Sequence, residues 1–91
     1  MYNIVYSEKL KNDFISIREF ISLDNPVYAV KTINSILKTI DILGDFPYIG
    51  KNIGSNLREI VENTYKYKII YTIVADTITI ISVYKYKNNW C

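Results

Sequence analysis

The chain has 91 residues, enough for one domain, and its hydrophobic content of 49% excludes an intrinsically disordered chain. The net charge of +2 indicates no class of partner on its own. Charge is uneven, however: residues 51–91 hold six Lys and Arg against three Asp and Glu, whereas residues 1–50 hold five against six. This asymmetry suggests an anionic partner for the C-terminal part.

The sequence predicts an intracellular setting without bound cofactors. The single cysteine, Cys91, excludes an intramolecular disulfide, which fits a reducing compartment. No run approaches the roughly 18 apolar residues of a membrane span, and the first residues lack the pattern of a signal peptide. No glycine-lysine phosphate loop and no cluster of metal ligands is present. We therefore expect a cytoplasmic protein with no metal, cofactor or membrane partner.

The first half of the sequence predicts a strand followed by two helices. Residues 2–6 are apolar and rich in β-formers, and Ser7 suits the N-cap of a first helix. Asn25 and Pro26 suit the start of a second helix, and Gly44 suits the C′ position at its end, ahead of Pro47. Each helix has an apolar stripe at helical spacing, and the two stripes are Leu10, Phe14, Ile17, Ile21 and Val30, Ile33, Leu37, Ile40.

The second half predicts a loop and three strands. Residues 44–56, GDFPYIGKNIGSN, form the glycine-rich stretch and are expected to be a loop. Segments at 57–61, 65–74 and 77–87 then follow a period of two, with a tight turn at Ala75-Asp76. The predicted order is β-α-α-β-β-β. We expect one α+β domain over residues 1–91, with a helical hairpin on one face of a mainly antiparallel four-stranded sheet.

A two-residue turn at Ala75-Asp76 would set the register of the last hairpin. Lys66 would then lie directly opposite Lys85, with Lys68 and Lys87 close by, on the face away from the helices. Like charges opposed on a sheet are destabilising, so the cluster is either an anion-binding site or a lysine-protected sheet edge.

The aromatic side chains of the last two strands are expected to lie mostly on the opposite face, against the helices. We expect Tyr65, Tyr67 and Tyr71 to belong to the core, and Tyr84 and Tyr86 to share their face where the sheet ends. Trp90 follows the last strand. It either clamps the chain end against the core or anchors a partner.

Five segments together resemble the RelE/ParE superfamily of bacterial type II toxin–antitoxin toxins, and in particular its ParE-like branch. In chain order they are NPVYAVKTINSI, LGDFPYIGK, NLREI, YKIIYTI and ISVYKYKNNW. The first is similar to the Asn-Pro helix start of the family, and the second to its Phe-Pro-x-Ile-Gly loop. The last departs from the family, because Lys85 and Lys87 stand where His and Arg are frequent.

The resemblance implies a growth-inhibiting toxin that a cognate antitoxin neutralises in a hetero-oligomer. RelE-like members cleave mRNA on the ribosome, whereas ParE-like members poison DNA gyrase. We favour gyrase as the target, with a ribosome-dependent mRNA endonuclease as the alternative. A plain RNA-binding module is disfavoured, because the net charge is low and no arginine-rich stripe is present.

The two functions assign different roles to the same residues. The chain has no histidine, so a ribonuclease would need lysines whose pKa values are lowered by neighbouring cations, with a tyrosine as acid. Its candidate catalytic residues are Lys66, Lys68, Arg58, Lys85 and Tyr86. A protein inhibitor needs contact residues only. The candidate target-binding or anion-binding residues are Lys51, Arg58, Lys66, Lys68, Lys85, Lys87 and Trp90.

Overall fold

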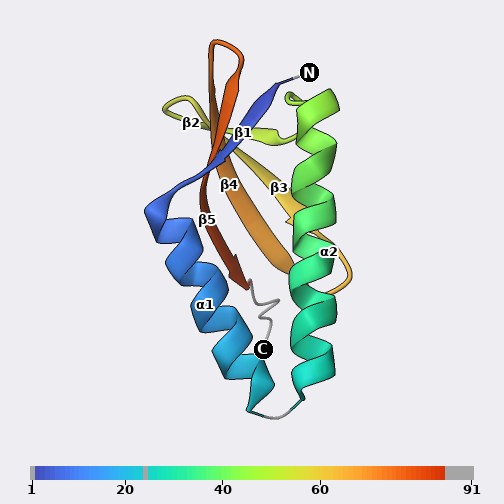
Figure 1. Ribbon diagram of the computed structural model, residues 1–91. Helices are drawn as coiled ribbons and strands as arrows, with labels where there is room; N and C mark the ends of the chain where they lie inside the picture. The colour runs from blue at the N-terminus through green and yellow to red at the C-terminus, as the bar shows by residue number, and fades with distance from the viewer. Residues whose placement is uncertain (1, 24, 86–91) are drawn as a thin grey trace.

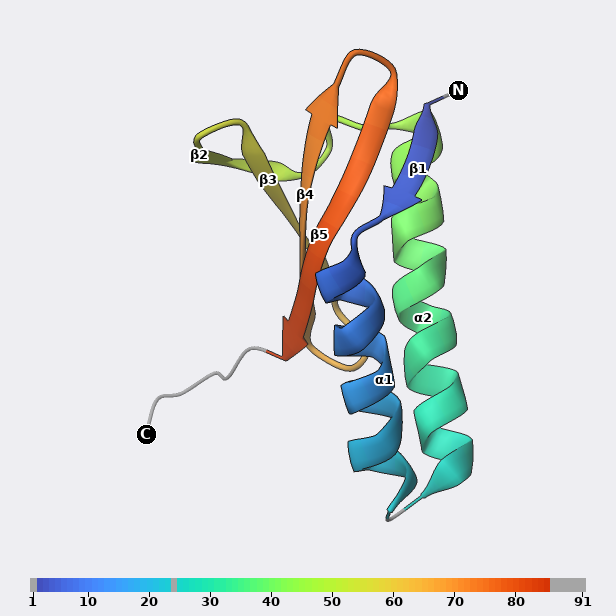
Figure 2. The ribbon, with the colours of Figure 1, turned by 60° about the vertical axis from the view of Figure 1, so that its left-hand side comes forward.

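A computed structural model describes residues 2–23 and 25–85, which form two layers: a helical hairpin and a sheet. The elements are β1 (Asn3–Tyr6), α1 (Glu8–Ser22), α2 (Pro26–Asp45), β2 (Lys51–Gly54), β3 (Leu57–Glu62), β4 (Tyr67–Val74) and β5 (Thr77–Lys85). Both helices lie on the same side of the sheet (Figures 1 and 2), which leaves the other face open. The strand order is β1-β5-β4-β3-β2, with β1 parallel to β5 and the other pairs antiparallel. The predicted α+β fold is confirmed.

The sheet of the described residues has one strand more than predicted, because part of the expected loop is β2. Gly54, Ser55 and Asn56 have φ values of +99°, +50° and +63°, and this left-handed turn reverses the chain. Asn52 thereby comes to pair with Arg58 in β3. A four-residue strand beside such a turn has too few residues to show a period of two, and the glycine-rich sequence therefore predicted a loop.

The predicted helix starts are confirmed by their hydrogen bonds. The Ser7 hydroxyl accepts from the Leu10 N–H at 3.1 Å, and the Asn25 side-chain oxygen accepts from the Tyr28 N–H at 3.1 Å. Pro26 occupies the first turn of α2, where no intrahelical partner for an N–H is needed. No helix among the described residues is long and apolar enough to cross a bilayer.

Two predictions about α2 were wrong. Its buried face is Ala29, Thr32, Ile36, Ile40 and Leu43, so only Ile40 of the predicted stripe is fully buried. Val30 is 59% exposed, because α2 packs against both the sheet and α1 and its buried face is rotated from the predicted stripe. The helix also continues through Gly44 to Asp45 and is capped at Phe46, immediately before Pro47.

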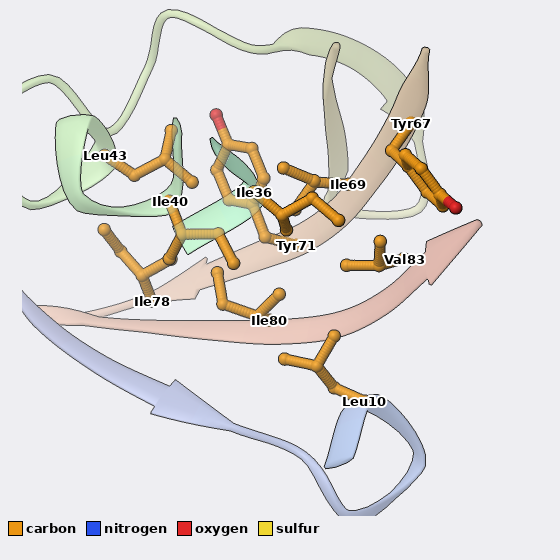
Figure 3. Close-up of a cluster of buried hydrophobic side chains, with 10 residues drawn as sticks. All are labelled: Leu10, Ile36, Ile40, Leu43, Tyr67, Ile69, Tyr71, Ile78, Ile80 and Val83. Carbon is orange, nitrogen blue, oxygen red and sulfur yellow. The ribbon is translucent and has the colours of Figure 1, made fainter. Parts of the chain in front are cut away.

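The core lies between the two helices and strands β4 and β5. Figure 3 shows side chains of α1 and α2 packed against those of β4 and β5. The core residues are Leu10, Ile36, Ile40, Leu43, Tyr67, Ile69, Tyr71, Ile78, Ile80 and Val83. The prediction that Tyr67 and Tyr71 belong to the core is confirmed, and the helices therefore cover the more apolar face, as expected.

The register of the β4–β5 hairpin changes at a bulge. The predicted pairing holds from Val74↔Thr77 to Tyr71↔Ile80, but Ile70 then pairs with Ser82, one residue later than predicted. Hydrogen bonds from the start of α1 hold the bulge in place. The Ser7 hydroxyl donates to the Ile81 carbonyl at 2.9 Å, and Asp13 accepts from the Ser82 hydroxyl at 3.1 Å and the Val83 N–H at 3.2 Å.

Candidate functional site

The predicted cluster of lysines is divided between different parts of the sheet. Because of the bulge, Lys85 pairs with Tyr67 on the helix-covered face, while Lys68 pairs with Tyr84 on the open face. Lys66 precedes β4, in the β3–β4 turn, with φ +67°. The prediction that Lys66 lies opposite Lys85 was therefore wrong. Tyr84, expected on the helix side, is 44% exposed on the open face.

Three of the candidate residues, Tyr86, Lys87 and Trp90, lie outside the described residues. The predictions about their roles, and about the position of Trp90, stay predictions.

On the open face, a carboxylate lies between two of the candidate lysines. Lys51 in β2 is the direct cross-strand partner of Glu59 in β3. The Lys68 amino group lies 3.7 Å from a Glu59 carboxylate oxygen, and the two side chains are 31% and 16% exposed. Glu59 therefore offsets part of the positive charge here, and the open face is less basic than the sequence suggested.

Arg58 holds the loop that joins α2 to β2. Its Nη1 donates to the Gly50 carbonyl at 2.7 Å and to the Tyr48 carbonyl at 3.2 Å. Its guanidinium also lies 5.0 Å from the centroid of the Tyr48 ring, within the range of a cation–π contact. These contacts give Arg58 a structural role in addition to its predicted role as a contact residue.

Tyr71 fixes the same loop from inside the core. Its hydroxyl donates to the Pro47 carbonyl at 2.8 Å and accepts from the Gly50 N–H at 3.0 Å. Burial raises the pKa of Tyr71 above its ordinary value, although the Gly50 hydrogen bond and the Arg58 charge act in the opposite direction. Loop 46–50 is thus held by two strands, and it exposes the apolar side chains of Phe46, Tyr48 and Ile49.

Sequence reasoning missed this set of contacts. The residues that make these contacts were visible in the sequence. Gly50 lies three residues after Pro47, Arg58 follows in β3, and Tyr71 occupies a core position of β4. That pattern does not reveal which backbone groups the arginine and the tyrosine reach, because the contacts join residues up to 24 positions apart.

A second unpredicted feature is a pocket of about 410 Å³ where the helix ends meet the end of the sheet. Its aromatic wall consists of Phe20, Tyr28, Tyr65 and Tyr67, and Lys85 lies beside them; we call it the aromatic pocket. The Lys85 amino group lies 5.7 Å from the centroid of the Tyr67 ring. Burial raises the pKa of Tyr67, and the charges of Tyr28 and Glu62 add to this rise. The volume is within the range of ligand pockets.

This geometry bears on the chemistry available to the site. Catalysis by these lysines would require them around one phosphate, and Lys68 and Lys85 lie on opposite faces of the sheet. Tyr67 and Tyr71 have raised pKa values and lie in the core. In residues 2–23 and 25–85, no three His, Cys, Asp or Glu side chains come together in a way that could hold a metal ion.

Comparisons with known proteins identify the relatives of this fold. The sequence model of the family described as "ParE toxin of type II toxin-antitoxin system, parDE" matches residues 4–90. No curated protein matches the sequence at a significant level.

Solved structures with a similar fold include three at 15% sequence identity, a level at which the likeness shows the fold alone. The chromosomal ParDE system of P. aeruginosa gives a TM-score of 0.83 over 96% of this chain and 98% of that chain. The isolated E. coli RelE toxin gives 0.71 over 98% and 88%, and the intact E. coli RelBE toxin–antitoxin complex gives 0.70 over 97% and 100%. The family match spans nearly the whole sequence and agrees with the observed fold, and the chain belongs to the ParE toxin family of type II toxin–antitoxin systems.

Proposed function

We propose that this toxin stops growth by binding DNA gyrase as a protein inhibitor, and that a cognate antitoxin neutralises it in a hetero-oligomer. The observation that carries the proposal is the match of residues 4–90 to the ParE family. The resemblance of the sequence to ParE-like toxins implies gyrase as the target. Gyrase acts in the cytoplasm, and we place the toxin there.

The arrangement of the basic residues supports an inhibitor over a nuclease. Cleavage of RNA needs a base, an acid and cations around one phosphate. The chain has no histidine, Lys68 and Lys85 lie on opposite faces, and Arg58 donates to two carbonyls of its own chain. A binding surface has no such requirement, because separate side chains contribute to affinity without sharing a proton.

The proposed target contacts are the candidate residues that the sequence indicated. Lys51 and Lys68 would contact the target on the open face, and Arg58 beside the exposed loop 46–50. Lys66 and Lys85 would contact the target at the end of the β4–β5 hairpin away from the Ala75-Asp76 turn. Lys87 and Trp90 complete the proposed set.

Exposed apolar side chains on the helical hairpin support a protein partner. Phe20 and Leu23 are 75% and 84% exposed, and Val27 and Val30 are also mostly exposed. A groove of about 350 Å³ runs between the helices beside Arg18 and Val30. The four exposed apolar side chains lie near the connection between α1 and α2. Exposed apolar patches are a frequent mark of a protein interface, and we assign this end of the hairpin to the antitoxin.

The proposal is tested in cells that express the toxin without its antitoxin. Growth should stop within a few generations and resume when the antitoxin is co-expressed. Plasmid DNA recovered from arrested cells should have lost negative supercoils, while mRNA mapped by primer extension should show no new cuts. Codon-phased cuts with normally supercoiled plasmid would instead identify an mRNA endonuclease and overturn the gyrase proposal.

A further inference from the structure

The aromatic pocket is one part of a longer groove between α2 and the end of the sheet. A second hollow of about 280 Å³ continues from it along α2, and Tyr65 lines both. Lys31 and Lys38 line the second hollow. We call the two hollows together the α2 groove. It is distinct from the exposed loop 46–50 and from the open face of the sheet.

The walls of the aromatic pocket are fixed before any ligand arrives. Tyr28 and Tyr65 pack edge to face, with ring centroids 5.1 Å apart and an interplanar angle of 81°. The Tyr65 N–H donates to Glu62 at 2.9 Å, and the Tyr28 N–H is held by the Asn25 cap. Tyr67 is almost completely buried. A preformed apolar pocket costs little ordering free energy when a large apolar side chain enters it.

The groove is also positively charged. Lys31 and Lys38 line the second hollow and have no ion pair among the described residues, whereas Lys9, Lys11 and Lys68 each lie within 4.0 Å of a carboxylate. Lys85 lies over the Tyr67 ring and forms no ion pair with a carboxylate of the described residues.

The carboxylate beside the second hollow, Glu62, forms no ion pair with these lysines. Glu62 is 2% exposed, and its oxygens accept from the Ser35 hydroxyl and from the N–H groups of Thr64 and Tyr65. Its lone pairs are therefore directed at groups within the fold. A ligand of the groove would meet an aromatic cavity followed by unpaired cations.

We propose that the α2 groove binds an acidic segment of the antitoxin, which inserts one large apolar side chain into the aromatic pocket. This inference rests on the proposed function, since it locates the antitoxin of the same toxin. Lys31 and Lys38 are seven residues apart on one helix, which places them roughly 10 Å apart along its axis. A helical segment matches this spacing with carboxylates seven residues apart on one of its faces.

A peptide fits the groove better than single-stranded RNA does. Bases bind where aromatic rings present free faces in series. Here Tyr28 and Tyr65 are perpendicular and pack on each other, and the aliphatic side chain of Ile21 lines the same pocket. Such a cavity accommodates a branched or aromatic side chain of a peptide.

The test measures the affinity of purified toxin variants for the antitoxin encoded beside the toxin. Phe20→Ala should weaken binding at least tenfold, because it removes a wall of the pocket. Lys31→Glu and Lys38→Glu should each weaken it about fivefold or more at low salt, with a smaller effect at 0.5 M NaCl. All three side chains are exposed, so the urea midpoints of these variants should stay close to wild type.

Ile15→Ala and Lys11→Glu are the matched controls, since each makes the same kind of change at an exposed α1 position that lines neither the groove nor the hollow between the helices. Both should bind within twofold of wild type. Groove variants that bind as tightly as the controls would overturn the inference while leaving the toxin and its antitoxin intact. A wild-type chain that neither stops growth nor binds the antitoxin would instead refute the proposed function itself.

A ten-nucleotide single-stranded RNA serves as the competing ligand. The inference predicts that Phe20→Ala and Lys31→Glu leave any RNA binding unchanged. RNA binding lost in these variants, with antitoxin binding retained, would assign the groove to nucleic acid and contradict the inference.

Discussion

Replacing Gly50 with alanine should destabilise the toxin strongly, although glycine there needs no left-handed backbone. A Cβ atom at Gly50 would lie 2.8 Å from Cε1 and 2.9 Å from Cζ of Tyr71, and closer still to its hydroxyl. Tyr71 is fully buried in the core, so its ring has no space into which to move. Loop 46–50 would have to shift instead.

The expected cost follows from the contacts that such a shift breaks. Overpacking a tight site costs about 1–3 kcal/mol. The Gly50 N–H bond to Tyr71 and the Gly50 carbonyl bond to Arg58 contribute about 1 kcal/mol each. A loss of about 3–5 kcal/mol is therefore expected from a total stability of roughly 5–15 kcal/mol. With a urea m value of about 1.5 kcal/mol per M, the midpoint should fall by about 2–3 M.

Urea unfolding followed by circular dichroism measures this change. Gly44→Ala is the control, because a Cβ there meets only ordinary contacts, 3.6 Å from Ile4, and alanine favours the helix by up to about 1 kcal/mol. Tyr71→Phe removes the atom in closest contact, so the Gly50→Ala and Tyr71→Phe costs should sum to more than the cost of the double variant. A Gly50→Ala midpoint equal to that of Gly44→Ala, or strictly additive costs, would refute the reasoning.

Three further predictions concern other parts of the fold. Ala75→Gly should stabilise the β4–β5 turn by about 0.5–1 kcal/mol, seen as a higher Tm, because Ala75 has φ +55°. Glu62→Ala should cost about 2–4 kcal/mol in urea unfolding, since three donors lose a buried carboxylate, and an unchanged midpoint would contradict this. Burial raises the pKa values of Tyr6, Tyr67 and Tyr71 above 10.0, which favours their neutral forms in the folded state. The resulting stability is present below pH 10 and is lost as pH rises through the folded pKa values, so a urea midpoint that stays constant to pH 12 would contradict the assignment.

Local signals in the sequence were sufficient for most of the fold. The caps at Ser7 and Asn25 and the turn at Ala75-Asp76 depend on residues within a few positions of one another, and the structure confirms them. The buried face of α2 depends on packing against two other elements, so the stripe that includes Val30 was misplaced. Strand β2 was missed because its turn residues dominate its short sequence.

The candidate site depended on contacts that the sequence does not show. One bulge, held by Ser7 and Asp13 from the start of α1, moves Lys85 away from Lys66 and onto the helix side of the sheet. The sequence separation of these partners is about 70 residues, and no local pattern records it. Arg58 was recognised as a candidate, but its contacts with loop 46–50 were not.

The most direct test of the proposed toxin function is the supercoiling activity of purified DNA gyrase with increasing amounts of the purified toxin. We expect supercoiling to be lost as toxin is added and restored by the antitoxin, while a ribosome-bound mRNA in a parallel reaction stays intact. Unaffected gyrase beside codon-phased cleavage of that mRNA would contradict the account, and would make the basic residues candidates for catalysis instead.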